Sequence, residues 1–222
     1  MNAAFLDKDT YEYLMNFADD RTILNMLAVN RKFNNDDFFR RVLQRKYPTL
    51  LDFKKENETY KHLFLRMVKT LAILKDEYDI PYIPTKRCNP EKLLEFAKNP
   101  KSNKSGYTVN EEALFCAAAG NHVNIVKYFI RRVRLRPLGT GINQAYDYAA
   151  RNEAYDVLDL LKDEVKYKDT AYDYAIRYGK LNLVKYLVEN GLRVYDFDVA
   201  KAERAGHEDV AEYLYKILSK EL

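Results

Sequence analysis

The chain has 222 residues, of which 47% are hydrophobic and 32% charged, a composition typical of a globular protein with one or two domains. The net charge of +4 is too small to predict a nucleic-acid-binding protein, and no run of about 18 apolar residues predicts a membrane-spanning helix. Glycine and proline are few and no strand pattern is evident, so we expect an all-α protein.

The two cysteines, Cys88 and Cys116, lie in different segments, and neither has a partner at the spacing of metal ligands. Their number is typical of a reducing compartment. The sequence does not begin with a basic segment followed by an apolar one, as a secretory leader would. We therefore expect a cytoplasmic protein.

Residues 1–50 are predicted to form a small helical bundle. Its three helices carry these apolar faces: Tyr11, Leu14, Met15 and Phe17; Ile23, Leu24, Leu27 and Ala28; Phe38, Phe39, Val42 and Leu43. The third helix should end before Pro48, because proline disfavours helix at the preceding residue. So short a segment can hardly bury all these side chains internally, so one face should meet a partner or the rest of the chain.

This segment resembles an F-box in Leu6, the helix with Leu14 and Phe17, and the run DDRTILNMLAVNRKFNNDDFFRRVLQRKYP. Asp7 replaces the usual proline after the first leucine, and a phenylalanine replaces the common tryptophan of the third helix. The resemblance implies a face for the Skp-type adaptor of a cullin ubiquitin ligase. That face would comprise Leu6, Leu14, Phe17, Ile23, Leu24, Leu27 and Val29. The other interpretation is an ordinary three-helix bundle with these residues as its own core.

Residues 51–109 are predicted to be a helical linker that also caps the region that follows. Apolar residues at three- and four-residue spacing predict one helix over residues 57–79. Three prolines mark an extended stretch around residues 80–89. A short helix over Pro90–Lys98 should start with Asn89 as its cap, and Asn110 should cap the next helix.

Residues 110–222 contain one pattern four times, each time a small residue, a gap and an apolar pair. The copies are Cys116–Phe129, Tyr148–Leu161, Tyr174–Leu187 and Lys201–Leu214. Their anchoring alanines, 26 to 32 residues apart, are Ala117, Ala149, Ala175 and Ala202. A repeat this short cannot bury a face alone and must stack on its neighbours.

Each copy is predicted to be a short helix, a tight turn and a second helix. Gly179 and Gly206 stand in the turn of the third and fourth copies, where a positive φ is expected. Asn121 and Glu153 replace them in the first two copies. Asparagine tolerates the left-handed region, whereas glutamate does so poorly.

The copies resemble ankyrin repeats. The AxxxGH turn is complete in the fourth copy as Ala202, Gly206 and His207, and His122 holds the equivalent place in the first. The stretches IVKYF and LVKYLVENG are typical of the second ankyrin helix. The TPLH tetrapeptide is missing and the loops are short, so we do not expect the usual β-hairpin fingers between the second and third copies.

An F-box-like segment, a helical linker and ankyrin copies in this order are similar to the F-box/ankyrin proteins encoded by large DNA viruses. In that family the ankyrin array holds a substrate and the F-box binds the Skp-type adaptor. The resemblance implies a protein of the host cytoplasm that recruits a substrate to a Skp–cullin–F-box ubiquitin ligase. The alternative is a non-enzymatic ankyrin scaffold or virion-associated protein without a ligase link.

Catalytic and metal-binding motifs are not found, so we expect no enzyme and no cofactor. Two of the three histidines, His122 and His207, fall at the ankyrin turn, where histidine commonly bonds to the backbone. The third, His62, has no obvious ligand partner.

Two groups of residues are candidate binding sites. A basic cluster at the end of the first copy either complements a helix dipole or contacts acidic protein or phosphate, and it consists of Arg131, Arg132, Arg134 and Arg136. Nucleic acid is not the expected partner, because only this cluster favours it.

The second group follows the paired small positions of the repeats, which in ankyrin arrays point into a groove. It comprises Arg151, Asn152, Arg177, Tyr178 and Arg204. We expect a row of arginines for an acidic segment of an unidentified protein substrate, with Tyr178 as an aromatic anchor. The other interpretation is a solvated row with no role.

Overall fold

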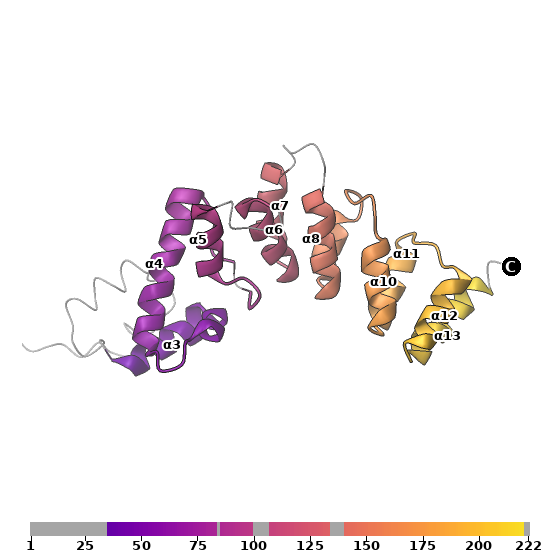
Figure 1. Cartoon of the computed structure of the whole chain (residues 1–222), viewed down its shortest axis with the longest axis horizontal. Coiled ribbons are helices and arrows are strands. Elements are labelled where there is room, and N and C mark those ends of the chain that lie inside the picture. The colour runs from indigo at the N-terminus through magenta and orange to yellow at the C-terminus, as the bar shows by residue number, and fades with distance from the viewer. Residues whose placement is uncertain (1–34, 84, 100–106, 134–139, 220–222) are drawn as a thin grey trace, which may run out of the picture. The chain divides into compact units, whose positions relative to one another are not determined.

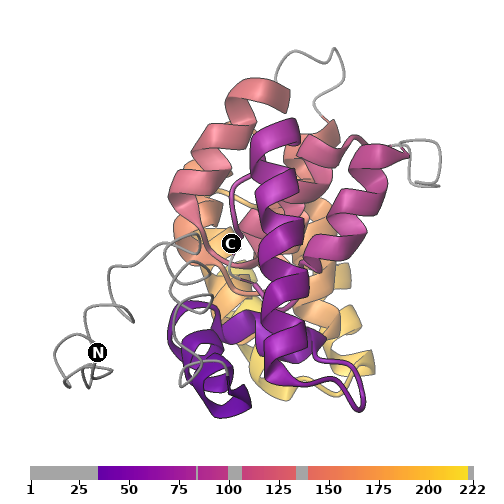
Figure 2. The same ribbon diagram turned by 90° about the vertical axis from the view of Figure 1, so that its left-hand side faces the viewer.

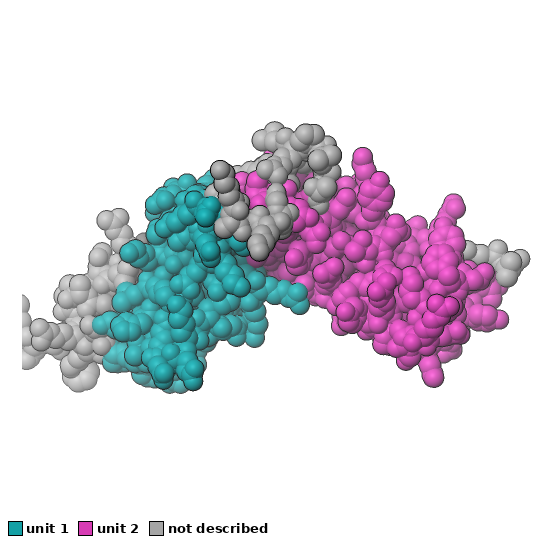
Figure 3. Space-filling model, viewed as in Figure 1, with its two compact units in different colours: residues 1–102 teal, residues 103–222 magenta. Residues whose placement is uncertain are grey.

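The structure is a computed structural model, and it describes residues 35–83, 85–99, 107–133 and 140–219. Every regular element in these ranges is a helix, which confirms the all-α class. The chain divides into two compact units, residues 1–102 and residues 103–222 (Figure 3). Each unit is described by itself.

Unit 1 contains four described helices, of which Figure 1 labels α3, α4 and α5, and Figure 2 shows the long α4 from another direction. They are α3 (Asp36–Lys46), the 3-10 helix η2 (Pro48–Phe53), α4 (Tyr60–Tyr78) and α5 (Pro90–Lys98). The side chain of Asn35 caps α3 by accepting from the Phe38 N–H, and Thr59 caps α4 by accepting from the His62 N–H. Asn89 caps α5, as predicted.

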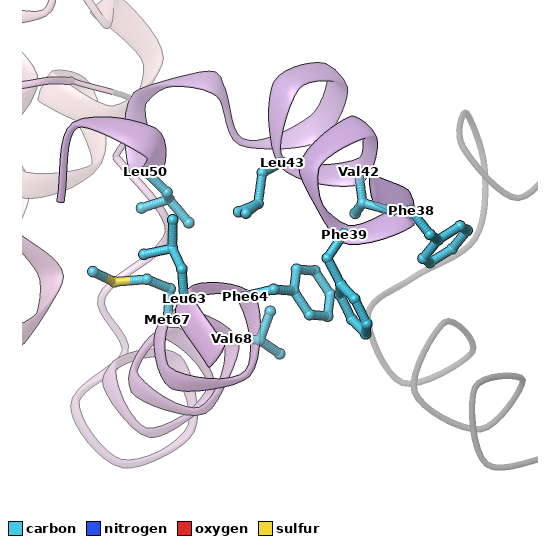
Figure 4. Packing of buried hydrophobic residues seen from close by; sticks show 9 residues of the cluster. All are labelled: Phe38, Phe39, Val42, Leu43, Leu50, Leu63, Phe64, Met67 and Val68. Carbon is cyan, nitrogen blue, oxygen red and sulfur yellow. The ribbon is translucent and has the colours of Figure 1, made fainter. Parts of the chain in front are cut away.

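The core of unit 1 joins α3, η2 and α4 (Figure 4). Its buried apolar residues are Phe38, Phe39, Val42, Leu43, Leu50, Leu63, Phe64, Met67 and Val68. The ring centroids of Phe39 and Phe64 lie 5.4 Å apart, across α3 and α4. The apolar face predicted for residues 38–43 is therefore covered by later parts of the same chain.

A partly buried ion cluster around Arg66 ties the other elements of unit 1 to α4. The guanidinium of Arg66 donates to both carboxylate oxygens of Glu58 at 2.8 Å. It also donates to the Glu91 carboxylate at 2.5 Å and to the Phe53 carbonyl at 3.0 Å. One side chain of α4 thus holds the end of η2, the loop before α4 and the first turn of α5. We call Arg66, Glu58 and Glu91 the Arg66 clamp.

Unit 2 contains four helix–turn–helix pairs, one for each predicted copy. They are α6 (Val109–Ala119) with α7 (Val123–Val133), α8 (Thr140–Arg151) with α9 (Tyr155–Leu161), α10 (Asp169–Arg177) with α11 (Leu181–Glu189), and α12 (Asp196–Arg204) with α13 (Glu208–Leu218). The prediction that Asn110 caps α6 is wrong. Thr108 is the cap, because its hydroxyl accepts from the Glu111 N–H while the Glu111 carboxylate accepts from the Thr108 N–H.

The first helices of the pairs form a row within unit 2, in which α6 packs on α8, α8 on α10 and α10 on α12 (Figure 1). The four anchoring alanines, Ala117, Ala149, Ala175 and Ala202, are fully buried. Their small side chains allow neighbouring helices to approach closely. The predicted apolar positions of the second helices are also fully buried at Phe129, Leu161, Leu187 and Leu214.

The turn between the two helices of each pair has a left-handed residue at the same position. The φ angles are 58° at Asn121, 53° at Glu153, 63° at Gly179 and 79° at Gly206. The positive φ predicted at Gly179 and Gly206 is confirmed, and Asn121 and Glu153 adopt it at the same position of the first two copies.

Candidate functional site

The three arginines predicted to form a row are the last residues of α8, α10 and α12, where a cation also complements the helix dipole. All three are exposed, but their surroundings differ. Arg177 Nε lies 2.6 Å from an oxygen of Asp173 in its own helix. Arg204 has no ion-pair partner among the described residues. The row therefore offers guanidinium groups that are not equally available.

Arg151 is held between two tyrosine rings. Its guanidinium carbon lies 6.0 Å from the ring centroid of Tyr148 in its own helix and 5.8 Å from that of Tyr174 in the next copy. Such contacts are favourable because the negative face of the ring attracts the cation. They hold Arg151 without a close ion pair, although the Asp147 carboxylate of the same helix interacts with it at longer range.

These residues belong to a longer aromatic–cation stack that crosses the first helices of three copies. In order, the stack is Tyr107, Phe115, Tyr148, Arg151, Tyr174 and Tyr178. The Phe115 and Tyr148 rings are parallel within 18° at 5.4 Å, and those of Tyr174 and Tyr178 lie 4.5 Å apart. The stack ends at Tyr178, whose side chain is 63% exposed.

Sequence reasoning found single members of the stack but not its continuity. The available signal is a tyrosine directly before the anchoring alanine in two successive copies, Tyr148 and Tyr174. Asn152, predicted to point into the groove, is half-buried and its amide donates to the Tyr148 carbonyl at 2.6 Å. Its side chain therefore hydrogen-bonds to a backbone carbonyl in the last turn of α8.

Polar contacts between consecutive copies gather near the turns. Lys180 Nζ lies 2.7 Å from the Glu153 carboxylate, and His207 Nε2 lies 2.9 Å from the Arg177 carbonyl oxygen. The Asn121 side chain bonds to the second copy in the same way, through the Val157 N–H. The backbone-bonding role predicted for His207 is confirmed.

The remaining predicted site residues are placed only in part. Arg131 is exposed in α7, and Arg132 belongs to the same helix. The others lie outside the described residues: Leu6, Leu14, Phe17, Ile23, Leu24, Leu27, Val29, Arg134 and Arg136.

Two acidic side chains of α8, the buried Tyr146 and the partly buried Asp147, have shifted pKa values. Burial, together with the nearby Asp147 and Asp159 carboxylates, raises the pKa of Tyr146 to about 12. Burial also raises the pKa of Asp147 to about 6, although Arg151 acts in the opposite direction. In the described ranges, no three His, Cys, Asp or Glu side chains come together as a metal site requires.

The sequence matches no protein-family model, and neither a curated protein nor a solved structure is similar enough to count as a match. None of the helices in the described part of the chain is long and apolar enough to cross a membrane.

Proposed function

We propose that unit 2 is a protein-binding array and that the chain is a non-enzymatic adaptor that recruits a protein substrate to a Skp–cullin–F-box ubiquitin ligase. The observation that carries the binding half is the row of exposed Arg151, Arg177 and Arg204 beside the exposed Tyr178. The ankyrin-like pattern of the four copies supports the same half, because stacked helix pairs offer extended binding surfaces.

The chemistry of this row suits an acidic segment of a partner. Guanidinium groups bind carboxylates through paired hydrogen bonds, and arginine and tyrosine are enriched among the residues that dominate binding energy. Arg151 is already positioned by Tyr148 and Tyr174, so less conformational entropy is lost when it binds.

The ligase half of the proposal rests on the F-box-like pattern of residues 1–50. Its predicted adaptor face, Leu6 to Val29, is apolar and would suit a Skp-type protein. The second candidate is a scaffold without a ligase link. It is favoured by the core of unit 1, in which α4 covers the apolar face of α3.

The test combines charge reversal with affinity purification of the full chain. In Arg151→Glu/Arg177→Glu/Arg204→Glu, the substrate proteins should be lost while any partner of residues 1–50 is retained. The matched control is Lys69→Glu/Lys92→Glu/Lys127→Glu, which changes the same charge at exposed positions outside the row. If the triple arginine variant keeps every partner, the row is not the binding surface.

The same purification separates the two candidates. A Skp-type protein that co-purifies with the wild type, and is lost in Leu24→Asp/Leu27→Asp while the circular dichroism melting curve is unchanged, supports the adaptor. Purification without any Skp-type protein leaves the scaffold as the function.

A further inference from the structure

A hollow of about 230 Å³ lies between the third and fourth copies, at the N-terminal ends of α10 and α12. We call it the Tyr195 hollow. Its apolar lining consists of Leu192 and three aromatic rings, those of Tyr172, Tyr195 and Phe197. The Arg177 and Arg204 positions lie at the opposite, C-terminal ends of the same two helices. The hollow is therefore separate from the row of arginines.

The aromatic wall of the hollow faces solvent. The Tyr195 and Phe197 rings are stacked with centroids 5.3 Å apart and an interplanar angle of 8°, yet their side chains are 49% and 61% exposed. Lys201 Nζ lies 5.6 Å from the Phe197 ring centroid, so this wall already accepts a cation.

The polar lining has more carboxylates than cations. Asp169, Asp173 and Asp198 face only Arg193 and Lys201. Lys201 is bound to Asp173 at 2.7 Å and lies 3.9 Å from Asp198. Asp169 has no ion-pair or hydrogen-bond partner among the described residues, and neither has Arg193, so the hollow has one free carboxylate beside one free guanidinium.

Two buried groups add to this picture. Burial above all raises the pKa of Asp198; the Tyr195 N–H and Lys201 act in the opposite direction, and the nearby Asp173 and Asp169 carboxylates add to the rise. The hydroxyl of Tyr172, a residue only 5% exposed, has no hydrogen-bond partner in the described part of the chain. A buried polar group without a partner costs stability unless something satisfies it.

We propose that the Tyr195 hollow binds an arginine side chain presented by an extended segment of a partner protein. A guanidinium group can stack on the outer face of the Tyr195 ring, whose other face is covered by Phe197, and pair with the Asp169 carboxylate at the same time, while its aliphatic stem lies along Leu192. A lysine would pair with Asp169 but lose the planar stacking. An acidic side chain would meet three carboxylates and only two cations, Arg193 and Lys201.

The probes for the test are pentapeptides of the form acetyl-Gly-Gly-X-Gly-Gly-amide, titrated into the full chain and followed by amide chemical shifts. With X as Arg, the amides of residues 192–201 should shift and saturate at roughly millimolar concentration, as expected for one side chain. With X as Lys the binding should be weaker, and with X as Glu or Leu these amides should not move.

Variants locate the binding site. Asp169→Asn and Phe197→Ala should each weaken binding of the Arg peptide about tenfold or more, whereas Phe197→Tyr should retain it. The control Asp163→Asn removes the same charge at an exposed position outside the hollow and should have no effect. The Arg peptide should also bind to the Arg151→Glu/Arg177→Glu/Arg204→Glu variant. A negative result for the row of arginines therefore does not contradict binding at the Tyr195 hollow. Equal shifts with Glu or Leu peptides, no shift with Arg, or full binding by both Asp169→Asn and Phe197→Ala would overturn it.

Discussion

At the scale of single residues, the turn position shows how one site can serve both backbone geometry and contact with the next copy. Glu153 and Asn121 adopt the left-handed region despite their side chains, and both side chains reach the following copy. Gly179 has no side chain, and the His207 ring of the following copy occupies that space instead. The turn residue of each of these three copies is therefore a point of contact between neighbours.

The two turn glycines should respond differently to substitution. A Cβ at Gly179 would lie 2.5 Å from His207 Nδ1, whereas a Cβ at Gly206 would meet nothing within 4 Å. Gly206→Ala should lower the free energy of unfolding by about 1 kcal/mol, which is the cost of placing a residue with a Cβ in the left-handed region. Gly179→Ala should cost about 2 kcal/mol or more, because it also displaces His207 from the Arg177 carbonyl.

Urea denaturation measures both losses. Gly179→Ala should cost less unfolding free energy in a His207→Ala background than in the wild type, because the clash with the His207 ring is absent there. Equal losses for the two glycine variants would show that the His207 ring moves aside freely.

At the scale of helices, the Arg66 clamp should make unit 1 sensitive to acid. Hydrogen bonding from Arg66, the largest cause, lowers the pKa of Glu58 from 4.5 to about 2 in the folded protein. The stabilisation is therefore present above pH 4.5 and is lost as the pH falls from there towards about 2. Glu58→Gln should lower the free energy of unfolding by roughly 1–2 kcal/mol at neutral pH. This difference from the wild type should vanish as the pH approaches about 2.

Chemical denaturation at a series of pH values gives this comparison. Glu56→Gln is the matched control, because Glu56 is exposed in the same loop and forms no ion pair within the described ranges. If Glu58→Gln and Glu56→Gln have the same pH profile, the clamp does not contribute to stability.

The helices were largely predictable because their signals are local. Apolar spacing and the Asn89–Pro90 start predicted α5 with the bounds that the structure has. The range predicted for α4, 57–79, is too long at both ends, because Thr59 caps its start and the left-handed Asp79 ends it after Tyr78. The predicted N-cap of α6 was wrong because both Thr108 and Asn110 are residue types that cap helices. The choice between them depends on the carboxylate of Glu111, which completes the capping box with Thr108. The aromatic–cation stack and the Tyr195 hollow depend on distances between side chains of different copies, which spacing along the sequence does not contain.

At the scale of the whole chain, unit 2 is a linear array in which each copy is stabilised by its neighbours. In such arrays stability is approximately a sum of terms within copies and between adjacent ones. The fourth copy contributes α12 to the row of first helices and α13 against α11. It also supplies Lys201 to Asp173 and His207 to the Arg177 carbonyl.

Deletion of residues 196–222 should therefore destabilise what remains of the array. It would uncover the faces of α10 and α11, where Leu183, Val184 and Leu187 are fully buried in the intact protein. We expect a melting temperature lower by more than about 5 °C and a tendency to aggregate, because apolar surface is exposed and the end of the array is lost. Calorimetry and light scattering measure both effects. Deletion of residues 220–222 alone, which leaves α13 intact, is the control. A protein without residues 196–222 that stays monomeric at an unchanged melting temperature would mean that the fourth copy does not stabilise the third.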